Sequence, residues 1–141
     1  MPPDPLLALL AERRTGVLVT LKRDGRPQLS NVSYAFDPAT GVVRISVTDD
    51  RAKVANLRRD PRVSLHATSP DMWSYAVVEG IGRLSPVAAA PDDDVVEQLV
   101  EQYRAVAGEH PDWAEFRAAM VADRRLLLSF AVEHRYGWAG A

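Results

Sequence analysis

The segment from Ser46 to Leu65, SVTDDRAKVANLRRDPRVSL, holds the residues whose types and spacing most clearly suit a functional site. It predicts a strand that ends at Thr48 and a short helix that opens at Asp49-Asp50. That helix carries Arg51 and Lys53 in its first turn. The N-terminus of a helix offers free backbone N–H groups and the positive end of the helix dipole. Two cations beside these groups favour binding of an anion, most often a phosphate.

A plainer interpretation of the same segment is a basic face in contact with water. Arg58, Arg59 and Arg62 follow closely, so Arg51 and Lys53 stand in a generally basic stretch. Isolated charges on a helix are more often solvated than bound to a ligand. The residues alone leave the two interpretations equally open.

The strand expected from Pro27 to Phe36 carries polar residues on both of its faces. Gln28 and Ser30 alternate with Asn31 along it, and neither face is uniformly apolar. Such a strand is unusual as a plain core element. Either it is an exposed hairpin strand whose polar side meets water, or its short polar side chains hold a ligand.

Other kinds of chemistry have little support in the sequence. Cysteine is absent, which excludes disulfides, thiolate metal sites and a thiol nucleophile. The three histidines do not have metal-ligand spacing, so no metal site is expected. Ser30, Ser33 and Ser74 lack a nucleophile elbow, and no Gly-rich dinucleotide loop is present.

The bulk properties favour a cytoplasmic protein with no nucleic-acid or membrane partner. The formal charge is −2 and the isoelectric point is about 5.9, so no strong positive field would attract nucleic acid or an anionic membrane. The N-terminal segment MPPDPLLALLAERR has no basic leader. No segment approaches the roughly 20 apolar residues that a spanning helix needs.

The remaining pattern predicts one domain, residues 1–141, that is mostly β with helices. Short connections such as the Asp24-Gly25 hairpin favour an antiparallel sheet closed into a six-stranded barrel. Gly80 and Gly82 are expected to permit a bend or bulge in a long strand. The strands are expected at 17–21, 27–36, 42–48, 62–68, 73–84 and 125–137, with a short helix at the Arg51 corner and a helix pair, about 92–107 and 112–122, before the last strand.

Five motifs, in this order along the chain, resemble one known superfamily. They are Gly16–Thr20, Asp24–Val32, Arg51–Lys53, Asn56–Arg62 and Trp73–Val77. Together they resemble the split-barrel, flavin-binding superfamily of pyridoxamine-phosphate-oxidase-like proteins, and within it the mycobacterial and actinobacterial deazaflavin-dependent oxidoreductases. The resemblance covers almost the whole chain and implies a split β-barrel.

The resemblance also implies a homodimer with two equivalent sites at the subunit interface. The cofactor in such proteins is coenzyme F-420, a deazaflavin, with FMN in sister branches. Lys53 matches the phosphate-binding lysine of the family, with Arg51 beside it. The other cofactor-binding residues implied by the resemblance are Gln28, Ser30 and Asn31 along the ring, Ser46, Val47 and Thr48 on the neighbouring strand, Asn56, and Trp73 and Tyr75 near the site across the interface.

From these residues we expect an F-420-dependent oxidoreductase that transfers a hydride between the reduced cofactor and an unsaturated organic acceptor. The alternatives are an FMN-binding oxidoreductase or flavin reductase on the same fold, or a non-catalytic cofactor-binding protein. No residue stands out as a catalytic acid or base. Oxidation of pyridoxamine phosphate is not expected, because the C-terminal stretch His134–Trp138 cannot be matched to the substrate-binding segment of the true oxidases.

Overall fold

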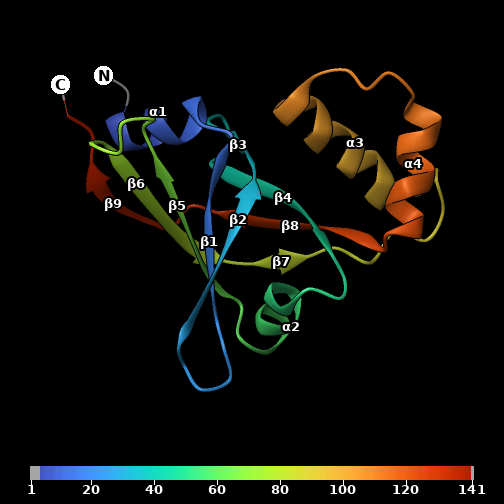
Figure 1. Cartoon of the computed structure of the whole chain (residues 1–141), viewed down its shortest axis with the longest axis horizontal. Helices are drawn as coiled ribbons and strands as arrows, with labels where there is room; N and C mark the ends of the chain where they lie inside the picture. The colour runs from blue at the N-terminus through green and yellow to red at the C-terminus, as the bar shows by residue number, and fades with distance from the viewer. Residues whose placement is uncertain (1–3, 141) are drawn as a thin grey trace.

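The structure, a computed structural model, describes residues 4–140 (Figure 1). Four helices and nine strands occur within this range. In chain order they are α1 (Pro5–Glu12), β1 (Thr15–Leu21), β2 (Pro27–Ser33), β3 (Ala35–Asp37), β4 (Val42–Thr48), α2 (Ala52–Arg59), β5 (Arg62–Thr68), β6 (Tyr75–Ile81), β7 (Arg83–Leu84), α3 (Asp94–Ala107), α4 (Trp113–Ala122), β8 (Arg125–Ala131) and β9 (His134–Trp138).

The strands form two antiparallel sheets that enclose one core. The first sheet has the order β2-β1-β5-β6-β9 and the second the order β3-β4-β8-β7. Alternate residues of both sheets point inward, as in β4, where Val43, Ile45 and Val47 are buried. Leu18 and Leu65 of the first sheet meet them from the other side. This arrangement confirms the expected split barrel.

Three of the six expected strands are each divided in two, which is why the structure has nine. Each break lies where the chain passes from one sheet to the other: between β2 and β3, between β6 and β7, and between β8 and β9. A strand that serves two sheets has to bend at the corner between them. At the first corner Tyr34 is fully buried, and its hydroxyl donates a hydrogen bond to the Leu10 carbonyl at 2.7 Å.

Gly80 explains the close packing at the second corner. A Cβ atom added to Gly80 would lie 2.3 Å from the carbonyl oxygen of Ala131, so only glycine lets β6 approach β8 this closely. Beyond it, Gly82 lies between β6 and β7, and its N–H donates to the Pro61 carbonyl at 2.7 Å. The bend expected at these two glycines is therefore confirmed.

The helices occupy three places around the barrel (Figure 1). Helix α1 packs near β3, β5, β6 and β9, while α2 lies within the connection from β4 to β5. The helix pair α3–α4 lies beside β4 and β8, where it forms a second apolar cluster around Val96, Leu99 and Phe116. Among the residues described here, no helix is long and apolar enough to cross a membrane.

The start of α2 differs from the sequence prediction. The helix does not open at Asp49-Asp50, because Arg51 is its N-cap and Ala52 its first residue. Asp49 instead pairs with Arg58 at 2.7 Å and with Arg124 at 3.1 Å, and these guanidinium groups hold the pKa of Asp49 below its usual range. Asp4 and Asp112 are the N-caps of α1 and α4, because their side chains accept hydrogen bonds from N–H groups in the first turns of these helices.

Candidate functional site

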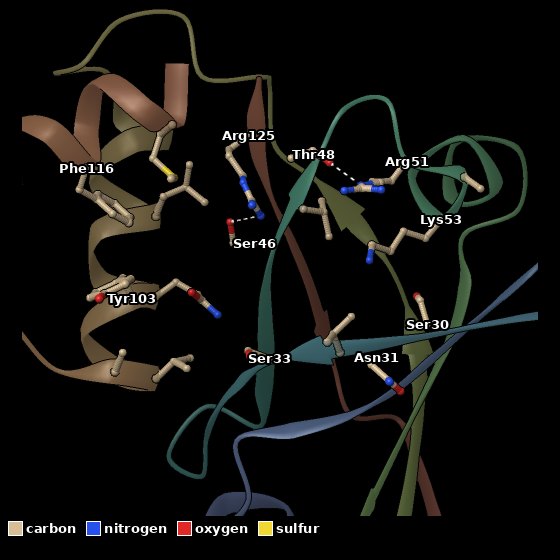
Figure 2. Close-up of a pocket in the computed structure, with 18 of the residues that line it drawn as sticks. Ser30, Asn31, Ser33, Ser46, Thr48, Arg51, Lys53, Tyr103, Phe116 and Arg125 are labelled. Atoms are coloured by element: carbon tan, nitrogen blue, oxygen red, sulfur yellow. Dashed lines mark hydrogen bonds between the residues drawn. The ribbon is translucent and has the colours of Figure 1, made fainter. Parts of the chain in front are cut away.

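A cavity of about 870 Å³ lies between the barrel and the helix pair (Figure 2). One wall is made by β2, β4 and the start of α2, and the other by α3, α4 and the first residue of β8. The cavity brings together eight of the eleven residues expected to bind a cofactor. These are Gln28, Ser30, Asn31, Ser46, Val47, Thr48, Arg51 and Lys53.

The cationic end of the cavity is built where β4 turns into α2. The Nε atom of Arg51 donates to the Thr48 hydroxyl at 3.1 Å, which holds the guanidinium beside the end of β4. Lys53 stands in the first turn of the helix and also lines the cavity. Arg125 enters from β8, where it lies opposite Thr48 in the strand pairing. Three cationic side chains therefore converge on one space.

Within the part of the chain that the structure describes, no carboxylate balances these charges. Among residues 4–140, none of Arg51, Lys53 and Arg125 forms an ion pair, and the described lining of the cavity contains no acidic residue. Burial lowers the pKa of Lys53, and repulsion by Arg51 and Arg125 lowers it further. An anion in the cavity would relieve this repulsion, so the geometry favours an anionic ligand.

The neighbouring basic residues have other partners, which separates them from the cavity. Arg58 pairs with Asp49, and Arg62 pairs with Asp60 at 2.7 Å. Arg59 donates to the Leu21 carbonyl and to the side chain of Asn56. For these three arginines the plainer interpretation of a basic surface holds.

The polar residues of β2 divide between its two faces. Gln28 and Ser30 share the inward face with buried Val32, whereas Asn31 lies on the other face and is exposed. In Figure 2 Ser30 points toward the space below Lys53, and Asn31 points away from it. Gln28 and Ser30 can therefore meet a ligand inside the cavity, and Asn31 lines its edge.

Asn56 does not line the cavity. It is buried in α2, and its Nδ2 atom donates to Gln28 Oε1 at 2.9 Å and to Thr20 Oγ1 at 3.1 Å. Its Oδ1 atom accepts from Arg59 at 3.1 Å. Asn56 thus orients the Gln28 side chain without lining the cavity itself, which is a positioning role.

Trp73 and Tyr75 also lie outside the cavity. Trp73 is 77% exposed, and Tyr75 stacks on His66 with ring centroids 5.7 Å apart. Tyr75 lies opposite Trp138 in the strand pairing, on the outer face of the five-stranded sheet. Within one subunit they cannot contact a ligand in the cavity, and their expected role across an interface stays a prediction.

The sequence prediction missed the second wall of the cavity. Its residues come from the helix pair and from β8, which follow β4 by more than fifty residues. They are Leu99, Gln102, Tyr103, Val106, Phe116, Met120 and Arg125. The sequence shows an apolar stripe on both helices, but the stripe alone does not indicate that it faces β2 and β4 across a cavity.

The cavity has the means to bind and orient a ligand, and no obvious group for covalent catalysis. Its lining offers three cations, hydroxyl and amide groups from two strands, and an apolar wall. No group of histidine, aspartate and glutamate residues in the described chain could hold a metal ion. The arrangement fits an anionic ligand that carries its own reactive group.

Among characterised sequences, the chain is similar to a reductase that depends on coenzyme F-420. Over 70 residues the chain is 33% identical to a biliverdin reductase of Mycobacterium tuberculosis (strain CDC 1551 / Oshkosh) that depends on reduced coenzyme F-420. The match covers 50% of this chain and 51% of the relative, so it spans about half the length of each.

Solved structures share the fold along the whole chain. A conserved hypothetical protein of Mycobacterium tuberculosis superposes with a TM-score of 0.74 at 22% identity, covering 99% of this chain and 85% of the other. An F-420 reductase superposes with a TM-score of 0.65 at 23% identity, covering 96% and 98%. At these identities the likeness establishes the fold.

Family membership rests on a match over nearly the full length. The family model described as pyridoxamine 5'-phosphate oxidase matches residues 3–139. The two-sheet barrel, the α2 corner and the cavity beside it agree with that match. The chain therefore belongs to the pyridoxamine 5'-phosphate oxidase family, on the split-barrel fold that the sequence motifs indicate.

Proposed function

We propose that this protein is an oxidoreductase that binds coenzyme F-420 in the cavity and uses it to reduce an unsaturated organic acceptor. The observation that carries the proposal is the pair of cations at the α2 corner, Arg51 and Lys53, which line the cavity without an acidic partner among the described residues. The dependence of the biliverdin reductase relative on reduced coenzyme F-420 supports the choice of cofactor.

The residues of the cavity fit the two ends of such a cofactor. Lys53 and Arg51 would hold its phosphate by charge-assisted hydrogen bonds, which are stronger than neutral ones. Gln28 and Ser30 would pair with the donors and acceptors along the polar edge of the ring system, with Asn56 fixing the Gln28 amide. Ser46, Val47 and Thr48 would form the floor along β4.

Because the cofactor carries the reactive group, the protein needs mainly to position the reactants and to exclude water from them. When bound, the reduced deazaflavin supplies a hydride, which together with a proton from solvent saturates one double bond of the acceptor and leaves the cofactor oxidised by two electrons. Lys53 and Arg51 fix the position of the phosphate and thereby the position of the ring. The apolar wall of α3 and α4 excludes water from the side where an acceptor would lie.

The test is a pair of titrations of the purified protein, one with coenzyme F-420 and one with FMN, followed by fluorescence. We expect F-420 to bind with a dissociation constant below about 50 µM, roughly −6 kcal/mol, and more tightly than FMN. Tighter binding of FMN would favour an FMN-dependent enzyme on the same fold. Failure of both to bind would refute the proposal.

Turnover separates an enzyme from a cofactor carrier. Oxidation of reduced F-420, followed by its absorbance, should accelerate when the protein and a suitable member of a panel of unsaturated acceptors are both present. Tight binding without acceleration by any acceptor would favour a non-catalytic cofactor-binding protein.

A further inference from the structure

The cavity has two walls of different character, and the proposed cofactor accounts for only one of them. The wall made by β2, β4 and α2 is polar and cationic. The opposite wall, on the helix pair, is largely apolar and includes Tyr103, Phe116 and Met120. A ligand held by Lys53 and the polar edge of β2 leaves the helix-pair wall free for a second molecule.

The helix-pair wall is held in place by its own packing. Phe116 and Met120 are each only 8% exposed, which shows that they are fixed in the second apolar cluster. Tyr103 packs edge-on against Phe116, with ring centroids 5.0 Å apart. Such aromatic contacts restrain both rings, so the wall offers a rigid surface to a flat apolar molecule.

Arg125 stands at the border between the two walls. Figure 2 shows it on the helix-pair side of β4, whereas Arg51 and Lys53 lie on the α2 side. Its Nη1 atom reaches the Ser46 hydroxyl only at 3.4 Å. Its Nε atom is buried and has no hydrogen-bond partner in the part of the chain that the structure describes.

A carboxylate is the group that best completes this arrangement. The guanidinium of arginine presents parallel N–H donors that match the two oxygens of a carboxylate. Arg125 lines the cavity and has no acidic partner among the described residues, so a carboxylate there would gain a charge-assisted pair. The apolar wall beside Arg125 favours a ligand whose remaining surface is aromatic or conjugated.

We propose that Arg125 and the helix-pair wall form the acceptor subsite, and that the acceptor is a largely apolar, conjugated molecule carrying a carboxylate. This inference rests on the proposed function, because it places the acceptor beside the cofactor. The carboxylate pairs with Arg125, and the conjugated body lies against Tyr103, Phe116 and Met120. The double bond to be reduced then faces the β2 side of the cavity.

The test uses a matched pair of probes, 2-naphthoate and its neutral analogue 2-naphthamide, and calorimetric titration of the purified protein. The wild-type protein should bind the naphthoate about tenfold more tightly than the naphthamide, since one charge-assisted pair is added. Arg125→Met should abolish this preference, and Arg125→Lys should keep part of it because the charge remains. Equal affinity of the wild-type protein for both probes would overturn the proposal without any variant.

A crossed control separates the subsite from the phosphate site. Lys53→Ala should weaken F-420 binding and leave naphthoate binding within about twofold, and Arg125→Met should do the reverse. If Arg125→Met weakens F-420 as strongly as Lys53→Ala does, Arg125 is a ligand of the cofactor and the proposal is wrong. If the wild-type protein binds neither F-420 nor FMN but keeps its preference for naphthoate, the proposed function fails and the carboxylate subsite stands.

Discussion

Lys53 is the residue on which the electrostatics of the cavity depend most. Burial and the nearby Arg51 and Arg125 lower the pKa of Lys53 in the free protein. A bound phosphate favours the charged ammonium and so raises the pKa of Lys53 on binding. By linkage, cofactor affinity is highest at pH values below the pKa of Lys53 in the free protein, and it falls as the pH rises through that pKa.

This linkage predicts a pH dependence that can be measured. The affinity for F-420 should begin to fall at a pH clearly below 10.5, the ordinary pKa of lysine. Lys53→Arg should remove this decline, because the guanidinium keeps its charge over the whole range. Titrations of both proteins at several pH values check this, and any titration of the cofactor itself cancels in the comparison. An identical decline in the variant would exclude Lys53 as its cause.

A second prediction concerns Asn56, whose hydrogen bond orients the Gln28 side chain. Asn56→Ala removes the three side-chain hydrogen bonds of Asn56, to Thr20, Gln28 and Arg59, and should lower the free energy of unfolding by about 1–3 kcal/mol. It should also weaken F-420 binding, because the Gln28 amide loses its orientation. Urea unfolding and cofactor titration measure the two effects. Arg58→Ala, an exposed position on the same helix, is the matched control and should change neither.

The strands that change sheets shape the molecule at the level of its elements. Gly80→Ala would place a Cβ atom 2.3 Å from the Ala131 carbonyl oxygen, and we expect a loss of about 1–3 kcal/mol or more in the free energy of unfolding. The exposed residue Arg83, just beyond the same corner, provides Arg83→Ala as a control that should be nearly neutral. A wild-type unfolding midpoint in Gly80→Ala would contradict the close approach of β6 to β8.

Local patterns predicted most of these elements, and tertiary contacts decided the rest. The strand expected at 42–48 is β4, and the helix expected at about 112–122 is α4. The break at Tyr34 could not be predicted, because it depends on the distant Leu10 carbonyl. The helix α2 was expected to open at Asp49-Asp50, but Asp49 forms ion pairs instead. Its pairing with Arg124, which lies 75 residues away, could not be inferred from local sequence.

The residues of the candidate site likewise fall into those that local sequence predicts and those that it does not. The α2 corner and β2 were predictable because their residues are close in the sequence and match known motifs. The contribution of Arg125 and of the helix pair follows from the pairing of β8 with β4, which brings Arg125 opposite Thr48. Nothing in the local sequence around Arg125 indicates that neighbour, so the second wall of the cavity required the structure.

At the scale of the whole molecule, the outer face of the five-stranded sheet carries exposed apolar side chains. Large apolar side chains are exposed there: Tyr75, Tyr136 and Trp138 lie on the neighbouring strands β6 and β9, and Leu29 lies on β2 at the opposite edge of the sheet. Exposed apolar groups of this size are typical of an interface. We propose that two copies of the chain pair through this face, which would bring Trp73 and Tyr75 of one copy near the Asn31 edge of the other.

Light scattering after size-exclusion chromatography tests this assembly. The wild-type protein should elute as a dimer, and Tyr136→Glu should shift it toward the monomer, because a buried charge without a partner opposes the contact. Cofactor affinity should fall together with the dimer if the partner completes the site. Arg83→Glu, on the other sheet, should leave the dimer intact. A monomeric wild-type protein at about 100 µM, where weak pairing with a dissociation constant near 10 µM would still be evident, would refute the pairing.

The central claim is that the cavity binds a cofactor through its phosphate at Lys53. The most direct test is the dissociation constant of coenzyme F-420 for the wild-type protein and for Lys53→Ala, measured side by side by fluorescence. We predict binding to the wild-type protein and a loss of about tenfold or more in the variant, with Arg58→Ala within about twofold of wild type. Equal affinity in Lys53→Ala, or no binding to the wild-type protein, would contradict the account.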